Sequence, residues 1–218
     1  MALITLTTDI GPKDYLVGAI KGQLLQFDPG FSIHDITHSL LPFNFPQAAY
    51  VCRNAIRNFP AGTFHIVLVN LFDKKAEQLL LAYHQQQYIL CADNGLLTMI
   101  LENSPEQIIG LALDRQQIQN TLYFASVMGR AIEQISRGKG LKEVGNTAVN
   151  YIQKNAIKPY VNDDFIEGHI IFIDHFENII LNITREEFDA HRKGRSFKIV
   201  FKRDKVIDTI SEQYSDVR

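Results

Sequence analysis

With 218 residues, the chain is long enough to bury a proper core in one large domain or two small ones. Hydrophobic residues make up 46% and charged residues 21% of it, which is ordinary for a globular protein. The formal net charge is −2 and both signs are interspersed, which gives no reason to expect nucleic acid or an anionic membrane as a partner.

The two cysteines, Cys52 and Cys91, both lie in apolar runs. We therefore expect reduced, buried thiols and a cytoplasmic location. The sequence shows no basic-then-apolar leader and no apolar run of membrane-spanning length, so we expect a soluble protein that does not interact with membranes.

The first predicted strand covers residues 2–7, where apolar and β-branched residues predominate. Gly and Pro in residues 9–12 predict a tight turn, and residues 14–27 predict a helix with one apolar face. Asp14 suits the start of that helix. Asp9 then lies at the carboxyl end of the first strand, where open α/β sheets bind ligands, although it could equally serve only to cap the turn.

The N-terminal part continues to alternate strands and helices. Further strands are predicted at 31–37, 63–69, 79–83 and 87–92, and further helices at 47–58, 96–101 and 126–137. The run 63–69 is continuously apolar, which is typical of a strand buried on both faces of a parallel sheet. This alternation indicates an α/β domain with a mostly parallel sheet over residues 1–158.

The pattern changes towards the C-terminus. Short β-rich runs are predicted at 168–173, 179–183, 196–201 and 205–210, with one helix at 185–191. These elements predict a smaller, mainly antiparallel β domain over residues 165–218. The segment 159–164 is expected to link the two domains.

The segment His34-Asp35-Ile36-Thr37-His38 groups two imidazoles and a carboxylate. On a regular strand the two histidines would face the same side but lie about 13 Å apart, at a rise of ~3.3 Å per residue. That separation is too large for one metal ion with Zn–N bonds of about 2 Å. We therefore expect no metal site, and an interpretation as a metal hydrolase is disfavoured.

Three motifs stand out along the chain. They are T-T-D-I-G at 7–11, followed by Asp14, Val17-Gly18 and Lys21-Gly22; A-D-N-G-L-L at 92–97; and I-D-H-F-E-N at 173–178, followed by Asn182-Ile183. In this order and spacing they resemble the motifs of the S-adenosylmethionine hydroxide adenosyltransferase family. Enzymes of that family hydrolyse S-adenosylmethionine (SAM) to adenosine and methionine, and they are related to fluorinases and chlorinases. The resemblance covers most of the chain.

For the N-terminal domain, the resemblance implies that Asp9 holds the ribose diol of the ligand and that Asn94 belongs to a substrate-binding loop. Phe43 matches the place where the family sets a large side chain near the nucleoside. It could stack on the substrate, or it could belong to the core or to an interface.

For the C-terminal domain, the resemblance implies that Asp174, Phe176 and Asn178 recognise the amine and the adenine. The side chains suit these roles, because a carboxylate can hold an ammonium, an aromatic face can stack on a purine and a carboxamide can bond to its edge. The alternative is an ordinary β-turn.

The family's water-activating Asp, Arg and His are replaced. Asn70, directly after the third strand, stands where the family has the Asp, and an ungapped alignment from there puts Glu77 at the Arg position. Residues 121–126 correspond to the family's T-F-H-G-R-D segment, so Tyr123 replaces the His. Asn cannot accept a proton, and Tyr, with a pKa of ~10, is a poor base at neutral pH. General-base assistance is typically worth ~10²–10⁴-fold, so its loss would leave a slow enzyme or none. Glu77 or Asp73 could act as a substitute base, and a shifted alignment would bring Asp73 or Lys75 into the site.

The leading hypothesis is a SAM-binding protein that hydrolyses SAM to adenosine and methionine by attack of water at the ribose 5′ carbon. The alternative is a catalytically silent protein that binds SAM or adenosine. Halogenation is disfavoured, because the carboxylate of Asp73 would repel a halide ion. SAM would be a substrate or ligand, and no cofactor is expected.

Family members are trimers whose sites lie between the α/β domain of one subunit and the β domain of its neighbour, so the resemblance implies a homotrimer. The family's last segment, N-S-x-G-x-L-E-I-A, has no counterpart after residues 208–217. The β domain is therefore expected to be shortened relative to the family.

Overall fold

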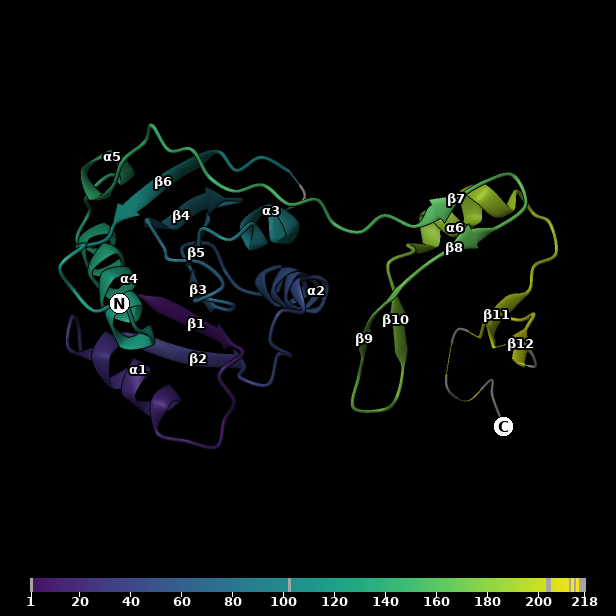
Figure 1. Ribbon diagram of the computed structural model, residues 1–218, viewed down its shortest axis with the longest axis horizontal. Helices are drawn as coiled ribbons and strands as arrows, with labels where there is room; N and C mark the ends of the chain where they lie inside the picture. Colours follow the sequence, from purple (N-terminus) through teal and green to yellow (C-terminus); the bar gives the residue numbers. More distant parts are fainter. Residues whose placement is uncertain (1, 102, 203–204, 212, 214, 216–218) are drawn as a thin grey trace. The chain divides into compact units, whose positions relative to one another are not determined.

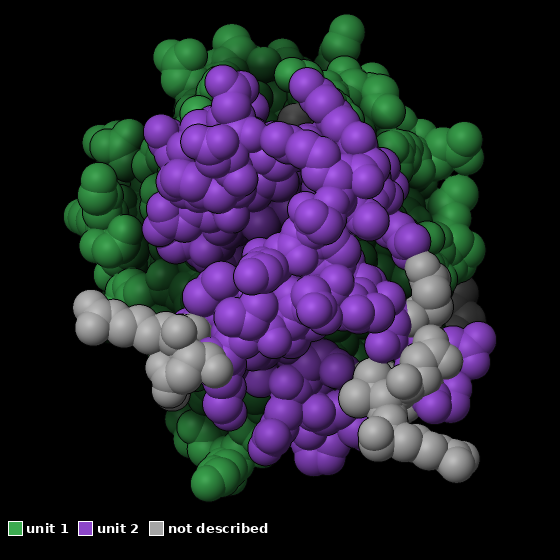
Figure 2. Space-filling model, turned by 90° about the vertical axis from the view of Figure 1, so that its right-hand side faces the viewer, with its two compact units in different colours: residues 1–156 green, residues 157–218 purple. Residues whose placement is uncertain are grey.

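The computed structural model describes residues 2–101, 103–202, 205–211, 213 and 215. Its chain forms two compact units, residues 1–156 and 157–218, which are coloured separately in Figure 2. Of the terminal segment 208–217 compared with the family above, residues 212, 214, 216 and 217 lie outside the described residues.

A six-stranded sheet forms the centre of the first unit (Figure 1). In spatial order its strands are β2 (Ser32–Thr37), β1 (Leu3–Thr8), β3 (Phe64–Leu68), β5 (Gln87–Ala92), β4 (Gln78–His84) and β6 (Gln107–Ala112). The first four run parallel to one another, and β4 is antiparallel to both of its neighbours. The prediction of a mostly parallel sheet is therefore confirmed, while β6 was not predicted.

Helices cover both faces of this sheet (Figure 1). The helices of the unit are α1 (Leu16–Leu25), α2 (Phe45–Ile56), α3 (Leu96–Leu101), α4 (Thr121–Ser136) and α5 (Leu141–Val144). Alternate residues of β3 point to opposite faces, so Ile66 packs in the cluster under α1 and α4, and Val67 packs in the cluster under α2 and α3. Each fully buried aliphatic side chain of this kind contributes about 1.5–3 kcal/mol to stability.

Helix α4 begins five residues before its predicted start at Ser126. Asn120 caps it, because its side-chain oxygen accepts a hydrogen bond from the backbone N–H of Tyr123. The first turn contains Thr121, Tyr123 and Phe124, which have low intrinsic helix propensity. The start of the helix could therefore not be predicted from the sequence pattern. Tyr123 therefore lies in the first turn of α4, although the sequence pattern placed it before the helix.

The pairing of β1 with β2 contains an irregularity. Leu6 lies opposite Asp35, but Thr7 lies opposite Thr37, so Ile36 is an extra residue on β2. Such a β-bulge disrupts the regular alternation of side chains along a strand. The regular-strand geometry assumed above for His34 and His38 is therefore wrong.

The described residues of the second unit form three two-stranded antiparallel sheets and one helix. The strand pairs are β7 (Tyr160–Val161) with β8 (Ile166–Glu167), β9 (Ile170–Ile173) with β10 (Ile179–Leu181), and β11 (Ile199–Lys202) with β12 (Lys205–Ile207); the helix is α6 (Arg185–Arg192). This confirms a mainly antiparallel β region. The segment 159–164, predicted as a linker, contains β7 and belongs to this unit.

Apolar side chains of the second unit are poorly covered. Within the part of the chain that the structure describes, no residue from 157 onward is buried. Ile173, Phe176 and Val200 are 54%, 78% and 61% exposed. Many exposed large apolar side chains within one small unit are a feature of interaction sites.

No helix among the described residues is both long enough and apolar enough to cross a membrane.

Candidate functional site

The carboxyl ends of three parallel strands carry three of the predicted binding and catalytic residues. Asp9 follows β1, Asn70 follows β3 and Asn94 follows β5. Because β1 pairs with β3 and β3 pairs with β5, all in parallel, these ends meet at one edge of the sheet. That edge is where open α/β sheets bind ligands.

Hydrogen bonds join these residues to one another and to Phe43. The backbone N–H of Asn70 donates to Asp9 Oδ2 at 2.9 Å, and the N–H of Phe43 donates to Asn70 Oδ1 at 2.6 Å. Asn94 Nδ2 donates to the carbonyls of Val69 and Asn70, at 2.9 and 3.2 Å. The structure thus brings together four of the predicted residues from four separate segments.

Two of the four residues have left-handed backbones, with φ of +62° at Phe43 and +50° at Asn70. Asn adopts this conformation readily, whereas a bulky residue such as Phe does so at a cost of order 1–3 kcal/mol. The Phe43 side chain is also 70% exposed, so burial does not offset the strain. Strain of this kind clusters at ligand-binding sites, which favours the prediction that Phe43 contacts a ligand.

A cavity of about 380 Å³ lies beside this edge. It is lined by the turn after β1 and by the segment after β2, namely Asp9, Ile10, Gly11, Pro12, Lys13, Asp14, His38, Ser39 and Leu40. Asp14 also accepts a hydrogen bond from the N–H of Leu16 at 2.8 Å, as expected for the start of α1. The cavity therefore presents two carboxylates to a ligand.

The side chain of Asn70 has a fixed orientation. Because Oδ1 accepts from the N–H of Phe43, Nδ2 is the end that points away from this bond. Asn70 is 6% exposed, and Nδ2 contacts no acceptor among the described residues. The amide of Asn70 cannot accept a proton from water, because its oxygen is engaged by Phe43 and its nitrogen is not basic.

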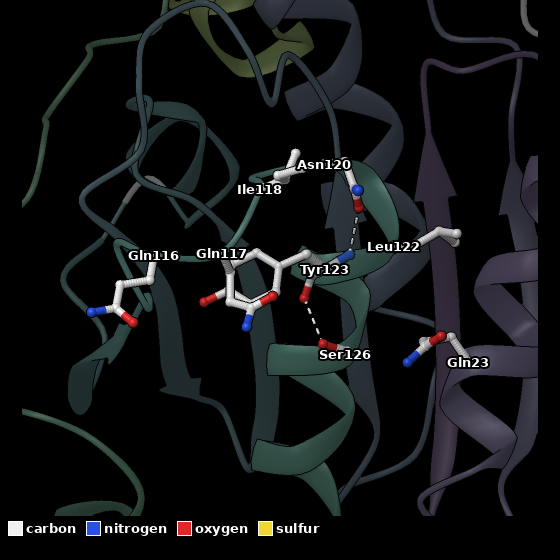
Figure 3. A pocket seen from close by; sticks show the side chains of 8 residues that line it. All are labelled: Gln23, Gln116, Gln117, Ile118, Asn120, Leu122, Tyr123 and Ser126. Atoms are coloured by element: carbon white, nitrogen blue, oxygen red, sulfur yellow. Dashed lines mark hydrogen bonds between the residues drawn. The ribbon is translucent and has the colours of Figure 1, made fainter.

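Tyr123, which stands at the position of the family's His, lines a different cavity, of about 480 Å³ (Figure 3). The wall of that cavity is mostly uncharged and rich in carboxamides: Gln23, Gln116, Gln117, Ile118, Asn120, Leu122, Tyr123 and Ser126. The backbone N–H of Asp114 donates to the Tyr123 hydroxyl at 2.6 Å. The structure thus places Tyr123 apart from the residues that line the cavity at Asp9.

Glu77, which stands at the position of the family's Arg, is exposed and lies in the segment between β3 and β4. Asp73 and Lys75 are exposed in the same segment. None of the three lines either cavity. Their catalytic roles stay predictions.

In the second unit, Asp174 closes the turn between β9 and β10. Its Oδ1 accepts from the N–H groups of Phe176 and Asn178, both at 2.8 Å, and its Oδ2 accepts from Asn178 Nδ2 at 2.7 Å. The bond from the Asn178 side chain, together with the backbone bonds, holds the pKa of the Asp174 carboxyl below its usual value. The turn is well defined and leaves the Phe176 ring exposed to solvent.

The two histidines of the segment 34–38 have different partners. His34 Nε2 lies 2.9 Å from the Ser32 hydroxyl, whereas the two nitrogens of His38 face Thr8 and Asp35. The described residues contain no group of three or more His, Cys, Asp or Glu side chains that could hold a metal ion. The pairing of Asp35 with His38 was not predicted, because the bulge at Ile36 leaves no signal in the sequence.

Comparisons with known proteins agree over both units. The family model described as "SAM hydroxide adenosyltransferase N-terminal domain" matches residues 4–145, and that of the corresponding C-terminal domain matches residues 168–218. An (R)-S-adenosyl-L-methionine hydrolase of Methanocaldococcus jannaschii is 29% identical over 190 residues, which cover 85% of this chain and 68% of the relative. A fluorinase of Actinoplanes is 25% identical, covering 86% of this chain and 73% of the relative.

Solved structures support the fold. A crystal structure of an uncharacterised conserved protein from Thermotoga maritima superposes with a TM-score of 0.81 at 24% identity, covering all of this chain and 85% of the other. A conserved hypothetical protein from Thermus thermophilus gives a TM-score of 0.65 at 22% identity, covering 84% and 73% of the two chains. At these identities the likeness establishes the fold alone.

Proposed function

The chain belongs to the SAM hydroxide adenosyltransferase family, and on that premise we propose that it binds SAM at the sheet edge around Asp9. The observation that carries this proposal is the hydrogen-bonded set of Asp9, Asn70 and Phe43 beside a cavity. These residues lie far apart in the chain, and the fold assembles them at the edge where open α/β sheets bind ligands.

The chemistry of the edge suits an adenosyl ligand. One oxygen of Asp9 accepts from the N–H of Asn70, and the other oxygen can accept hydrogen bonds from a ribose diol. The exposed ring of Phe43 offers a face for stacking. The carboxylates of Asp9 and Asp14 also suit the positive charge of a sulfonium ligand.

We further propose that the working form is a homotrimer in which a neighbouring subunit completes each site. The poor coverage of the second unit supports this proposal, because an interface would bury side chains such as Ile173. In this arrangement Asp174, Phe176 and Asn178 of the neighbour would face the amine and the adenine. The turn that Asp174 closes would hold the Phe176 ring in a fixed place.

The reaction we propose is hydrolysis. Water attacks the ribose 5′ carbon, the bond from that carbon to sulfur breaks, methionine leaves as a neutral thioether, and the water loses one proton to give adenosine. The leaving group needs no general acid, so the protein must hold an in-line water and exclude other solvent. The carboxylates of Glu77 and Asp73 are the candidates to receive the proton.

A silent SAM- or adenosine-binding protein is the second candidate. A specific observation favours this second candidate. The side-chain oxygen of Asn70 accepts from the N–H of Phe43, and its amide nitrogen is not basic, so Asn70 cannot act as a base. In addition, the Tyr123 hydroxyl accepts from the N–H of Asp114 and lines a separate cavity. The edge would then retain the ligand without converting it.

One experiment separates these candidates. Purified protein is incubated with SAM, and adenosine and methionine are quantified by chromatography, with SAM affinity measured by calorimetry in parallel. We expect micromolar or tighter binding and slow release of both products. Binding without products would favour the silent binder, and absence of binding would contradict the proposal.

Asp9→Ala and Asp28→Ala form a matched pair for this experiment. Asp28 likewise accepts from a backbone N–H, that of Gly30, but it precedes β2 and so lies at the opposite edge of the sheet. Loss of binding in Asp9→Ala with normal binding in Asp28→Ala is the expected result.

A further inference from the structure

Four side chains form a continuous chain of contacts beside the cavity. Lys21 Nζ lies 2.5 Å from Asp35 Oδ2, Asp35 Oδ1 lies 3.2 Å from His38 Nε2, and Thr8 Oγ1 lies 3.0 Å from His38 Nδ1. These residues come from α1, from β2 and the segment after it, and from the end of β1. The function proposed above uses none of them.

The chain of contacts runs from solvent to the buried end of β1. The side chains of Lys21 and Asp35 are 32% and 39% exposed, His38 is 9% exposed, and Thr8 is fully buried. His38 itself lines the cavity. Thr8, at the buried end of this row of contacts, directly precedes Asp9 in the sequence. The row of contacts therefore ends next to the carboxylate that is proposed to bind the ligand.

The β-bulge makes the contact between Asp35 and His38 possible. On a regular strand, residues three positions apart point to opposite faces. The extra residue at Ile36 reverses that alternation and lets both side chains meet. Bulges often re-aim a side chain next to a functional site in this way.

Each ring nitrogen of His38 lies close to one polar group. Nδ1 lies 3.0 Å from the Thr8 hydroxyl, and Nε2 lies 3.2 Å from the Asp35 carboxylate, an ion-pair contact whose geometry falls short of a hydrogen bond. A proton on Nε2 suits the carboxylate, and Nδ1 can then accept from the Thr8 hydroxyl. Partial burial alone would raise the pKa of the Asp35 carboxyl, but the contacts with Lys21 and His38 outweigh it and keep that pKa below its usual value. Asp35 therefore stays charged and fixes the imidazole.

The backbone of His38 makes a second contact with the same turn. Its carbonyl accepts from the N–H of Gly11 at 2.8 Å, where the backbone is left-handed with φ of +81°. His38 thus contacts the residue before Asp9 through its side chain and the second residue after Asp9 through its main chain. The Asp9 turn is held on both sides by one residue.

We propose that His38 is a positioning residue for the Asp9 turn and that Asp35 and Lys21 hold it in place. His38 does not need to touch the ligand in this role; it sets where the Asp9 carboxylate points. The role of His38 in ligand binding rests on the proposed function. The effect of His38 on the position of the Asp9 carboxylate is independent of that function.

The first test measures amide hydrogen exchange in the full chain without ligand. The N–H of Asn70 donates to Asp9 Oδ2, so its exchange rate reports on where that carboxylate lies. In His38→Ala we expect exchange at Asn70 to be at least tenfold faster, with exchange at Ile66 in β3 unchanged. Wild-type exchange at Asn70 in a folded His38→Ala variant would overturn the proposal.

Three further variants make this result specific. His34→Ala removes a histidine of the same strand whose ring contacts Ser32, and it should leave exchange at Asn70 unchanged. His38→Asn keeps an acceptor near the place of Nδ1 and should restore slow exchange. If His38→Ala does not fold, Thr8→Val removes the same hydroxyl–imidazole bond and should also accelerate exchange at Asn70; no acceleration would overturn the proposal.

The second test measures the affinity for SAM and for adenosine by calorimetry. We expect His38→Ala to bind at least tenfold more weakly, His38→Asn to recover most of the loss, and His34→Ala to match the wild type. Equal affinity in His38→Ala and wild type would overturn the role in binding. If wild-type protein binds neither probe, the proposed function fails, and the exchange at Asn70 still decides whether His38 positions Asp9.

Discussion

At the scale of single residues, Asn70 determines how the site can act. Its backbone N–H holds Asp9, its side-chain oxygen holds Phe43, and its Nδ2 contacts no acceptor among the described residues. A carboxylate at this position could keep the bond to Phe43 and also accept a proton. The chemistry of the edge therefore depends on one amide group.

Asn70→Asp is expected to increase the rate of adenosine formation from SAM by tenfold or more, because general-base assistance is typically worth ~10²–10⁴-fold. The rate is measured in single turnovers by chromatography. Asn70→Ala is the control, since it removes the amide without adding a base. An Asn70→Asp variant no faster than wild type would show that position 70 does not face the attacking water.

We expect replacement of Phe43 to affect stability and ligand binding in opposite directions. Phe43→Gly removes a strained left-handed backbone, which costs of order 1–3 kcal/mol for a bulky residue, and this gain offsets the entropy cost of glycine. We expect unchanged or higher stability in urea unfolding together with at least tenfold weaker adenosine binding. Unchanged binding would show that the ring does not contact the ligand.

Because His65 is buried, we expect the stability of the first unit to fall at acidic pH. Burial lowers the pKa of His65 to about 4, and its Nδ1 lies 2.7 Å from the Thr5 hydroxyl. Its folded pKa is below the unfolded value of ~6.5, so the unfolded state binds more protons, and stability falls as the pH drops from about 6.5 to about 4. The full contribution is about 3 kcal/mol.

Urea unfolding at several pH values measures this effect. Because carboxylates also titrate in this range, the comparison is between wild type and His65→Gln. We expect wild type to lose more stability on acidification than the variant does. Parallel losses in the two proteins would contradict the assignment to His65.

At the scale of elements, the turn after β5 joins the site to a segment that we call the strap, residues 150–156. Asp93 Oδ1 accepts from the N–H of Ile152 at 2.7 Å, and Thr98 exchanges hydrogen bonds with both the N–H and the carbonyl of Lys154. The neighbouring Asn94 of the same turn bonds to Asn70. One turn therefore contacts both the site and the strap.

The double variant Asp93→Ala, Thr98→Val should loosen the strap. We expect trypsin to cleave after Lys154 at least tenfold faster than in wild type, because local opening exposes the backbone to the protease. Glu133→Ala is the control, since it removes only a surface ion pair with Arg137. An unchanged cleavage rate would contradict the role of these bonds.

Elements with a strong local pattern could be predicted from the sequence. The apolar run of β3 and the strand–turn–helix around Asp9 follow from composition and turn residues, and the structure confirms them. The strand β6 and the first turn of α4 were missed, because tertiary contacts rather than propensity define them. The bulge at Ile36 depends on register between two strands and has no local signal.

The same distinction applies to the candidate site. Asp9, Asn70 and Asn94 could be expected at one edge, because each follows a strand of a parallel sheet. The bond that locks the Asn70 amide depends on the left-handed backbone of Phe43, which no residue pattern predicts. The contact of His38 with Asp35 could not be predicted either, because the bulge at Ile36 that allows it leaves no signal in the sequence.

At the scale of the whole molecule, the second unit has apolar side chains that stay exposed among its described residues. The proposed trimer would bury them and bring the turn of Asp174 and Asn178 to the Asp9 edge of a neighbour. The central claim is therefore that each ligand site is shared between two subunits.

Mixing two defective variants tests this claim most directly. Asp9→Ala and Phe176→Ala each damage one half of the proposed site, and neither should bind adenosine alone. After unfolding and refolding together in equal amounts, random mixing in a symmetric oligomer should restore about a quarter of the sites, because each restored site takes one intact half from each variant. Calorimetry that finds this fraction supports the account, and a mixture that binds no adenosine although each variant refolds and the wild type binds would contradict it.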